Sequence, residues 1–274
     1  MSRILVIRRG GLGDTLLTVP LLRALRRTSE GASLHLAGNR EFCDIPCAYG
    51  TVDVAHSAED LWLWVPERAR QCLQGFDIVF GDEPDCVHQP LDLRGGGAGV
   101  PFALHLARAA GYEPRWPQDC QLLPPRDLVG GAVLIAPGSG GSHKCWPREH
   151  WLGLAQRLSR RGHPLKVLVG PVERERDDPR KWPWPGGCLD FVVEEQPARL
   201  ARRIESSSVF VGNDSGPTHL AAMLGVPTVA VFVATDPTIW APVGAHVHVI
   251  GAAAELPSID GVDGLLDEAL AWRG

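Results

Sequence analysis

The sequence predicts an α/β protein built from two similar halves, each around a parallel β-sheet. Three observations support this prediction. Short β-branched runs alternate with helix-like segments along the 274 residues. Two of these runs lead into a glycine-rich loop and then a helical pattern, once near residue 10 and once near residue 140. A polar stretch with two prolines at 119–131 separates the halves, so we expect domains of residues 1–125 and 126–274.

In the first half, the run RILVI at 3–7 has the composition of a buried parallel strand. The loop RRGGLGD at 8–14 follows it, and then one helical pattern extends from Leu16 to Leu25. Later strands are predicted at 33–37, 52–55 and 77–80. This half therefore opens as a unit of strand, loop and helix.

The second half repeats this plan. The run AVLIA at 132–136 leads into the loop PGSGGSHK at 137–144, and a helix is predicted over 147–161. Later strands are predicted at 165–169, 190–193, 209–211 and 228–233, and a last helix at 262–272. The loop at 179–188 contains Trp182 and Trp184, which we expect to pack rather than to form a stacking platform.

The composition limits the functions that the chain can have. A net charge of −5 and a pI near 6.1 argue against the broad basic surface of a nucleic-acid binder, so any anion site must be local. The seven cysteines show no C-x-x-C spacing, which predicts neither a disulfide framework nor a metal site. No apolar run is long enough to span a bilayer, and the charged start leads into a strand rather than a signal peptide. We therefore expect a cytoplasmic protein.

The most informative segment is VFVGNDSGPTHLAAMLGVPTVAVF at 209–232, in which a strand passes through a polar turn into a helical pattern. Pro217 suits the first turn of a helix, where its missing N–H would be unpaired anyway. The N–H groups of 215–218, with the helix dipole and side chains of the first turn, would favour phosphate or carboxylate. Asp214 would repel such an anion unless it bound something else, such as sugar hydroxyls. Capping of the helix by Asp214 or Ser215 is an equally good interpretation of this segment alone.

Neither glycine loop matches a standard nucleotide-binding motif. The first has Leu16 where G-x-G-x-x-G requires glycine, and the next strand ends without an acid for a ribose, which disfavours a nicotinamide dinucleotide. The second lacks the spacing of a P-loop, because Lys144 is followed by Cys145. Its small residues can still approach a phosphate closely, and Lys144 supplies a positive charge. A solvated surface lysine is the alternative.

Three segments together resemble glycosyltransferase family 9, the ADP-heptose:lipopolysaccharide heptosyltransferases. They are RRGGLGDTLLTVPLLRALR, APGSGGSHKCWPREHWLGLAQRL and VGNDSGPTHLAAMLGVPTVAVFVATDPTIWAPVG, in this order. The resemblance implies a GT-B architecture, with two Rossmann-like domains facing a cleft and the nucleotide-sugar donor bound mainly by the second. It also implies an inverting, metal-independent transfer from an ADP-sugar, with ADP-heptose as the expected substrate and no cofactor.

The resemblance assigns the role of general base to Asp14, at the end of a glycine loop that contains Gly11 and Gly13. A carboxylate there would take the proton of the acceptor hydroxyl while the diphosphate leaves from the opposite face of the sugar. Helix capping is the alternative role of Asp14.

The same resemblance assigns donor binding to the second half. The residues that match the family's diphosphate contacts are Ser139, Lys144, Ser215, Gly216, Thr218 and His219. Asp214 is expected to hold sugar hydroxyls, and Glu173 falls where the family has a glutamate near the donor ribose. An exposed acid at a helix start is the alternative for Glu173. Lysine contributes most by neutralising the charge that grows on the leaving diphosphate.

The chain also departs from the family pattern. Where members usually carry another strand and helix after the strand at 77–80, residues 83–102 are rich in glycine and proline, so we expect a trimmed acceptor side. FVATDP at 232–237 replaces the usual F-G-P-T-D-P. The implied partners are a nucleotide sugar and a glycan or lipid-linked glycan acceptor such as lipopolysaccharide core. Such an acceptor is compatible with peripheral contact at the cytoplasmic face of the inner membrane.

Two other functions fit the same sequence. A nucleotide-sugar epimerase of the GT-B fold would need further acid and base residues beside the sugar, and the chain offers no clear second carboxylate. A non-catalytic nucleotide-sugar-binding protein would not need Asp14 after its glycine loop. Glycosyl transfer is therefore the function that we expect.

Overall fold

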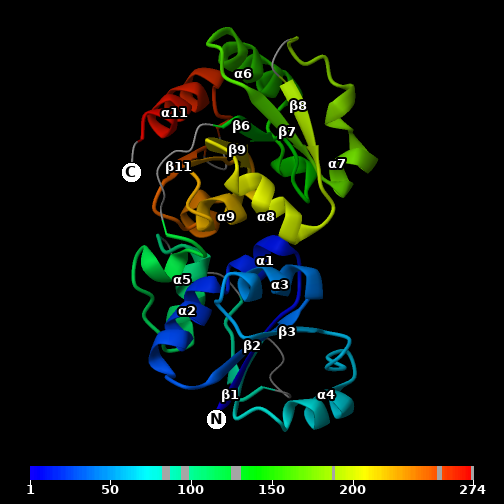
Figure 1. Cartoon of the computed structure of the whole chain (residues 1–274), viewed down its shortest axis with the longest axis vertical. Coiled ribbons are helices and arrows are strands. Elements are labelled where there is room, and N and C mark those ends of the chain that lie inside the picture. The colour runs from blue at the N-terminus through cyan, green and yellow to red at the C-terminus, as the bar shows by residue number, and fades with distance from the viewer. Residues whose placement is uncertain (82–86, 94–98, 125–130, 187–188, 252–254, 273–274) are drawn as a thin grey trace. The chain divides into compact units, whose positions relative to one another are not determined.

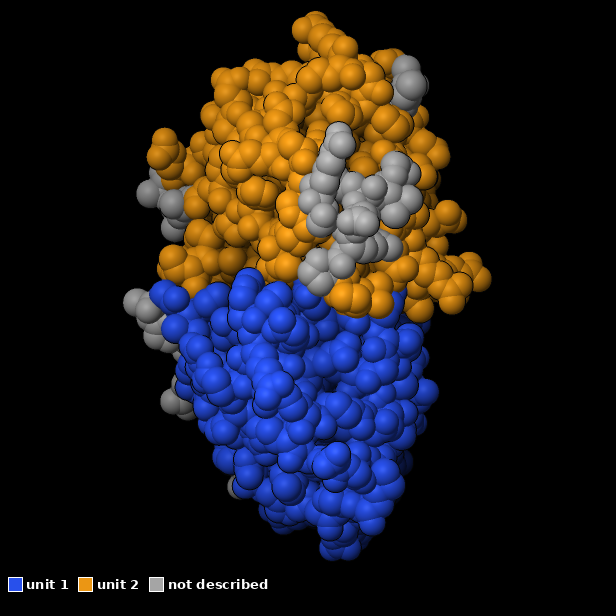
Figure 2. Space-filling view, turned by 60° about the vertical axis from the view of Figure 1, so that its left-hand side comes forward, with its two compact units in different colours: residues 1–122 blue, residues 123–274 orange. Residues whose placement is uncertain are grey.

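The structure is a computed structural model that describes residues 1–81, 87–93, 99–124, 131–186, 189–251 and 255–272. The chain divides into two compact units, Met1–Leu122 (unit 1) and Leu123–Gly274 (unit 2), which are coloured separately in Figure 2. The predicted boundary between residues 125 and 126 lies outside the described residues. Each unit has one β-sheet with helices packed on it, as Figure 1 shows.

The sheet of unit 1 has five parallel strands in the order β3-β2-β1-β4-β5. The strands are β1 (Arg3–Arg8), β2 (Ser33–Gly38), β3 (Val54–Ser57), β4 (Ile78–Gly81) and β5 (Gln89–Pro90). The helices are α1 (Leu12–Leu16), α2 (Val19–Thr28), α3 (Arg40–Ala48), α4 (Pro66–Leu73) and α5 (Phe102–Ala109), with a 3-10 turn η1 (Gln118–Cys120). Every strand predicted for this half is confirmed to within two residues.

The sheet of unit 2 has six parallel strands in the order β11-β10-β9-β6-β7-β8. The strands are β6 (Val133–Ala136), β7 (Leu165–Val169), β8 (Leu189–Val193), β9 (Val209–Asn213), β10 (Thr228–Val231) and β11 (Val247–Ile250). The helices are α6 (Arg148–Arg160), α7 (Pro171–Arg176), α8 (Pro197–Glu205), α9 (Gly216–Met223), α10 (Pro237–Trp240) and α11 (Ile259–Ala271), with 3-10 turns η2 (Ser142–Lys144) and η3 (Pro179–Lys181). Two parallel sheets with helices between their strands confirm the predicted α/β class.

The strand order fixes where a ligand would bind in each unit. In unit 1, β2 and β3 follow one another on one side of β1, and the chain then crosses to β4 on the other side of β1. In unit 2, β7 and β8 follow one another on one side of β6, and the chain then crosses to β9 on the other side of β6. Open α/β sheets bind ligands at the carboxyl ends of the strands where the order reverses in this way. The loops after β1, β6 and β9 are therefore the places to look for a site.

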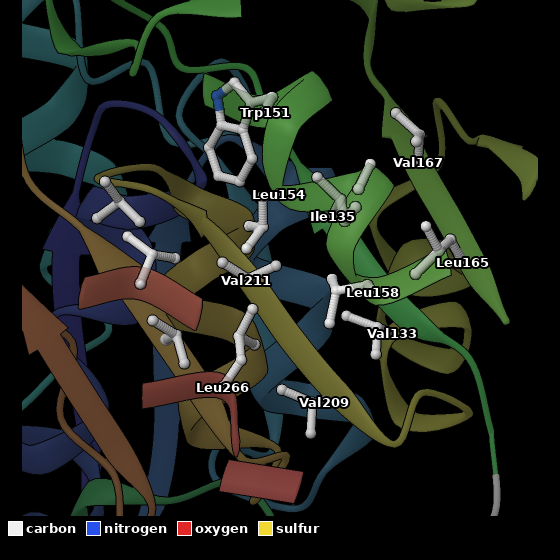
Figure 3. Packing of buried hydrophobic residues seen from close by; sticks show 14 of the residues in the cluster. Val133, Ile135, Trp151, Leu154, Leu158, Leu165, Val167, Val209, Val211 and Leu266 are labelled. Carbon is white, nitrogen blue, oxygen red and sulfur yellow. The ribbon is translucent and has the colours of Figure 1, made fainter. Parts of the chain in front are cut away.

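The core of unit 2 explains why its central strands are continuous apolar runs. Every residue of β6, β9 and β10 is buried, as expected for parallel strands covered on both faces. On one face, Trp151, Leu154 and Leu158 of α6 and Leu266 of α11 belong to one buried cluster with Val209 and Val211 of β9, which Figure 3 shows. This packing holds the central strands, and with them the loops at their carboxyl ends.

The prediction of one continuous first helix is wrong. The structure has two helices, α1 and α2, which are separated at Leu17 and Thr18. Pro20 lies in the first turn of α2, where a missing N–H is tolerated, whereas in a continuous helix its ring would clash with the carbonyl of Leu16. The break leaves α1 as a short helix directly after the loop that follows β1.

Two strands lie outside the predictions. β11 pairs in parallel with β10 from Thr228 opposite Val247 to Val231 opposite Ile250. All four of its residues are partly exposed or exposed, so it lacks the continuous apolar character of the central strands. β5 has two residues and is too short for any periodicity to show. In the described part of the chain, no helix is both long and apolar enough to cross a membrane.

Candidate functional site

The loops after β6 and β9 lie side by side at the carboxyl ends of their strands. Asn213, the buried last residue of β9, joins them: its Nδ2 donates to the carbonyl of Pro137 at 2.7 Å, and its Oδ1 accepts the N–H of Trp146 at 2.9 Å. Ser139 Oγ donates to the carbonyl of Asp214 at 2.7 Å. The structure therefore brings the second glycine loop and the D-S-G turn together, where the strand order reverses.

Asp214 is at the centre of this site. Only 7% of its side chain is exposed, and its Oδ2 accepts hydrogen bonds from Lys144 Nζ at 2.8 Å and Thr235 Oγ1 at 2.7 Å. His219 Nε2 lies 3.9 Å from Oδ1, which is longer than a normal hydrogen bond. Burial by itself would raise the pKa of Asp214, but His219, Lys144 and Thr235 together lower it to about 2. The carboxylate is therefore ionised at neutral pH.

Lys144 forms the boundary between this buried carboxylate and the solvent. It ends the turn η2, and 30% of its side chain is exposed. An ammonium group has three N–H donors. Asp214 is the only hydrogen-bond acceptor of Lys144 among the residues that the structure describes, so two donors remain for a ligand.

The helix α9 begins beside the same carboxylate. The N–H groups of Ser215 and Gly216 have no acceptor within the described ranges. The prediction of free N–H groups over 215–218 is wrong at Thr218, whose N–H donates to the carbonyl of Ser215 at 3.1 Å because the first turn is tight. The start of the helix therefore offers two backbone donors to an anion.

The side chains of Thr218 and His219 are turned inward. They are 1% and 4% exposed, and the Thr218 hydroxyl donates to a backbone carbonyl of β9 at 2.5 Å. His219 Nδ1 is buried and has no hydrogen-bond partner among the described residues. Their predicted role as direct phosphate donors stays a prediction, because both side chains would have to turn outward to contact a ligand.

Glu173, in the first turn of α7, packs against two glycines. A Cβ on Gly138 would overlap the Glu173 carboxylate, and a Cβ on Gly170 would lie 2.6 Å from its Oε2. Glycine at both positions lets the carboxylate lie next to the backbone. A cavity of about 280 Å³ opens beside it, with a lining that includes Ser139, Arg148, Glu173, Arg176 and Trp182.

Arg176, in the last turn of α7, lies at the site but is absent from the residues predicted from the sequence. Its Nη2 donates to the carbonyl of Gly140 at 3.1 Å, and its Nη1 to that of Ser139 at 3.4 Å. Arg176 therefore braces the second glycine loop from the side of the cavity. A signal for it exists, because Arg176 follows Glu173 at the spacing that places two residues on one face of a helix.

The tryptophan loop is packed, as predicted. The rings of Trp182 and Trp184 stack with their centroids 5.5 Å apart, and both pack against the core of unit 2. Trp184 Nε1 donates to the carbonyl of Pro179 at 2.7 Å. The guanidinium of Arg148 lies 5.2 Å from the ring centre of Trp182, so this loop also closes one side of the cavity.

Asp14 is held in unit 1 by Arg8, the last residue of β1, and by Gly11 of the loop that follows. Its Oδ2 accepts the N–H of Gly11 at 3.0 Å, which caps α1, and its Oδ1 accepts a hydrogen bond from the Arg8 guanidinium. The alternative role of Asp14, helix capping, is therefore confirmed for its Oδ2. The side chain is still 40% exposed, whereas that of Arg8 is 10% exposed. Asp14 is thus an oriented carboxylate that a substrate can reach.

Gly10 is the position in this loop that requires glycine. Its φ is +132°, and a Cβ there would lie 2.6 Å from Asp14 Oδ2. At Gly11 a Cβ would lie 3.8 Å from the same oxygen, an ordinary contact, so the part played by Gly11 is its N–H. The prediction for this loop named Gly11 and Gly13. It did not include Gly10, which has the strictest backbone requirement of the three.

Known proteins share both the sequence and the fold of this chain. The sequence model of glycosyltransferase family 9 (heptosyltransferase) matches residues 112–263. Lipopolysaccharide heptosyltransferase 3 of Escherichia coli K12 is 28% identical over 123 residues, which cover 40% of this chain and 33% of that protein. Lipopolysaccharide heptosyltransferase 1 of Pseudomonas aeruginosa is 23% identical over 291 residues, which cover 86% of this chain and 79% of that protein.

A solved structure with the same fold is the E. coli heptosyltransferase WaaC, determined with ADP and with ADP-2-deoxy-2-fluoro heptose. It is 20% identical, with a TM-score of 0.72 over 97% of this chain and 99% of that chain. This likeness confirms the GT-B fold class. The match to the E. coli heptosyltransferase 3 spans about a third of that protein's length. Because the family model matches more than half of the sequence, the chain belongs to glycosyltransferase family 9.

Proposed function

We propose that the chain transfers a sugar from an ADP-sugar, most simply ADP-heptose, to a hydroxyl group of a glycan acceptor. The observation that carries this proposal lies at the carboxyl ends of β6 and β9, where the Lys144 ammonium binds Asp214. Asp214 directly precedes the N–H groups of Ser215 and Gly216, which have no acceptor among the described residues. Such a combination suits a diphosphate. The ADP bound to WaaC, a protein of the same fold, supports adenosine as the nucleoside.

Lys144 and the start of α9 would act on the leaving group. The donor diphosphate would accept hydrogen bonds from Lys144 and from the N–H groups of Ser215 and Gly216. As the bond between the anomeric carbon and the diphosphate breaks, negative charge grows on the leaving oxygen, and a cation already in place stabilises that state most. Glu173, beside the cavity, is proposed to accept hydrogen bonds from the donor ribose.

Asp14 would act on the acceptor. It takes the proton of the acceptor hydroxyl as that oxygen bonds to the anomeric carbon, while ADP leaves from the opposite face with the bonding electron pair. One displacement of this kind inverts the configuration at the anomeric carbon. Arg8 and the N–H of Gly11 support this role, because they orient the carboxylate before the substrate arrives.

We propose that the transfer needs no metal ion. Lys144 and the dipole of α9 would supply the positive charge that Mg²⁺ supplies at many other diphosphate sites. The proposed acceptor is a glycan or a lipid-linked glycan such as lipopolysaccharide core, a class supported by the names of the relatives. Such an acceptor would bring the protein to the cytoplasmic face of the inner membrane.

A thermal-shift screen of nucleoside diphosphates and nucleotide sugars tests this function. A ligand that binds only the folded state stabilises it by about 2.7 kcal/mol at 100 times its Kd, so a ligand that binds more tightly raises the Tm more at the same concentration. ADP and ADP-heptose should therefore raise the Tm more than UDP and GDP do. The shift should persist in excess EDTA. Absence of a shift with every nucleoside diphosphate would contradict the proposal. A shift with UDP-sugars alone would favour the epimerase. ADP-sugar binding with no release of ADP when a glycan acceptor is added would favour the non-catalytic binder.

A further inference from the structure

We propose that Asp214 and Thr235 are positioning residues that together aim the Lys144 ammonium at the donor diphosphate. This inference rests on the function proposed above and deepens it. It gives a role to Thr235, which neither the glycine loop nor the D-S-G turn includes. It also changes the role of Asp214, which would act on the donor through Lys144 rather than by binding sugar hydroxyls.

The three residues come from the loops that follow three neighbouring strands, at the carboxyl ends of those strands. Lys144 follows β6, Asp214 follows β9 and Thr235 follows β10, and these strands are neighbours in the order β10-β9-β6. The Lys144 ammonium and the Thr235 hydroxyl both donate to the same oxygen of Asp214, at 2.8 and 2.7 Å. One buried carboxylate oxygen therefore connects the loops that would surround the diphosphate.

Burial separates the part of this group that is fixed from the part that can reach a ligand. Asp214 is 6% exposed as a residue, and turning it outward would break both hydrogen bonds of an ionised carboxylate. Thr235 is partly exposed, but its hydroxyl is engaged with Asp214. Lys144 has 30% of its side chain exposed and two N–H donors free within the described part of the chain. Asp214 would therefore influence diphosphate binding by orienting Lys144, not by contacting the diphosphate itself.

Thr235 decides how freely Lys144 can turn toward a ligand. With the Thr235 hydroxyl present, Oδ2 of Asp214 shares its charge between two donors. Without the hydroxyl, the ammonium becomes the only strong donor to that oxygen, and the buried carboxylate holds it more tightly. The loop after β10 also loses its connection to Asp214. Both effects would make Lys144 a poorer partner for the diphosphate.

The test compares Thr235→Val with two other variants. Thr235→Val keeps the shape of the side chain and removes the hydroxyl, so we expect the Kd for ADP, measured by calorimetry, to rise about tenfold. Thr235→Ser restores the hydroxyl and should recover most of the affinity. Thr238→Val is the matched control, because the Thr238 hydroxyl also donates to an aspartate, Asp236, at 2.8 Å in the same region. It should leave the Kd unchanged.

A double-mutant cycle with Lys144→Ala separates positioning from a merely structural role. If Thr235 acts through Lys144, Thr235→Val should cause almost no further loss of ADP affinity in the Lys144→Ala background. The Tm of each variant is measured in the same buffer. A structural role would lower the Tm of Thr235→Val but would leave the Kd of the folded protein unchanged.

The outcomes separate this inference from the proposed function. If wild type binds ADP and Thr235→Val binds it equally well, the positioning role is overturned and the function stands. If Thr235→Val loses affinity equally in the wild-type and Lys144→Ala backgrounds, Thr235 acts independently of the lysine and the inference is likewise overturned. If wild type binds no nucleoside diphosphate, both fall together.

Discussion

At the scale of single residues, the proposed chemistry depends on a carboxylate whose orientation is set before the substrate arrives. Asp14 has one oxygen on the N–H of Gly11 and the other on the Arg8 guanidinium. Gly10 allows the close approach, because any side chain there would meet Oδ2. The base is therefore fixed by the local conformation of one loop.

Asp14→Asn should remove most of the transfer activity and leave donor binding intact. The amide oxygen can still accept the N–H of Gly11 that begins α1, but the side chain can no longer take a proton. We expect kcat to fall by about 10²- to 10⁴-fold. The measurement is ADP release from ADP-heptose with a lipopolysaccharide-core acceptor, and calorimetry should give an unchanged Kd for ADP.

Asp44→Asn is the matched control for this variant. Asp44 also pairs with an arginine of unit 1, Arg40, at 2.9 Å, but it lies on the exposed surface of α3. Its loss should leave kcat unchanged. Wild-type turnover by Asp14→Asn would remove Asp14 as the base.

At the scale of elements, β2 and β3 bring two histidines, His35 and His56, into contact in unit 1. His35 Nδ1 and His56 Nε2 lie 2.9 Å apart, and the two rings stack with their centroids 5.1 Å apart. Burial, followed by the neighbouring His56 and Arg3, lowers the pKa of His35 to about 4. Burial is also the main cause that lowers the pKa of His56. Both rings are therefore neutral in the folded protein at neutral pH.

The histidine pair should lower the stability of the protein as the pH falls from about 6.5 toward 4. The unfolded chain takes up protons first, because its histidines keep the ordinary pKa, so the full contribution is present above about pH 6.5 and is lost below it. We expect the Tm, followed by circular dichroism, to fall less steeply over this range in His35→Phe than in wild type. His163→Gln, which leaves the pair intact, should follow the wild-type slope. Equal slopes in wild type and His35→Phe would rule out the pair as the cause.

How well an element can be predicted from the sequence depends on its burial. β7 was predicted with its bounds, because four of its five residues are apolar and buried, as is typical of a strand covered on both faces. β11 shows no such run, since its residues are half exposed at the edge of the sheet. The periodicity of α1 continues into α2, so only the backbone requirement of Pro20 marks the break between them.

The site could be predicted as far as its residues lie close together in the sequence. Ser139 and Lys144 share one loop, so a local motif contains both. Thr235 contacts Asp214 across 21 positions, and no local pattern encodes that contact. Arg176 contacts the glycine loop across 36 positions, and its spacing from Glu173 is the one local sign of it. The need for Gly10 rests on a positive φ, which the letters of a G-G-x-G loop do not locate.

At the scale of the whole molecule, the two units have different parts in the proposed reaction. Unit 1 contributes Asp14, which would act on the acceptor, and unit 2 contributes Lys144 and the start of α9, which would act on the donor. The net charge of the chain is −5, so the attraction for a diphosphate must come from these few groups rather than from the protein's overall field. Removal of one lysine should therefore have a large effect on donor binding.

The most direct test of this account is the calorimetric Kd for ADP of wild type, Lys144→Ala and Lys166→Ala. Lys166 is the matched control, because it is the second residue of β7, near the amino end of that strand, whereas the site lies at the carboxyl ends. We predict that Lys144→Ala raises the Kd about 10- to 100-fold, the effect of losing a hydrogen bond to a charged group, while Lys166→Ala leaves it unchanged. Equal ADP affinity in wild type and Lys144→Ala, with both proteins folded, would show that Lys144 does not bind the donor diphosphate.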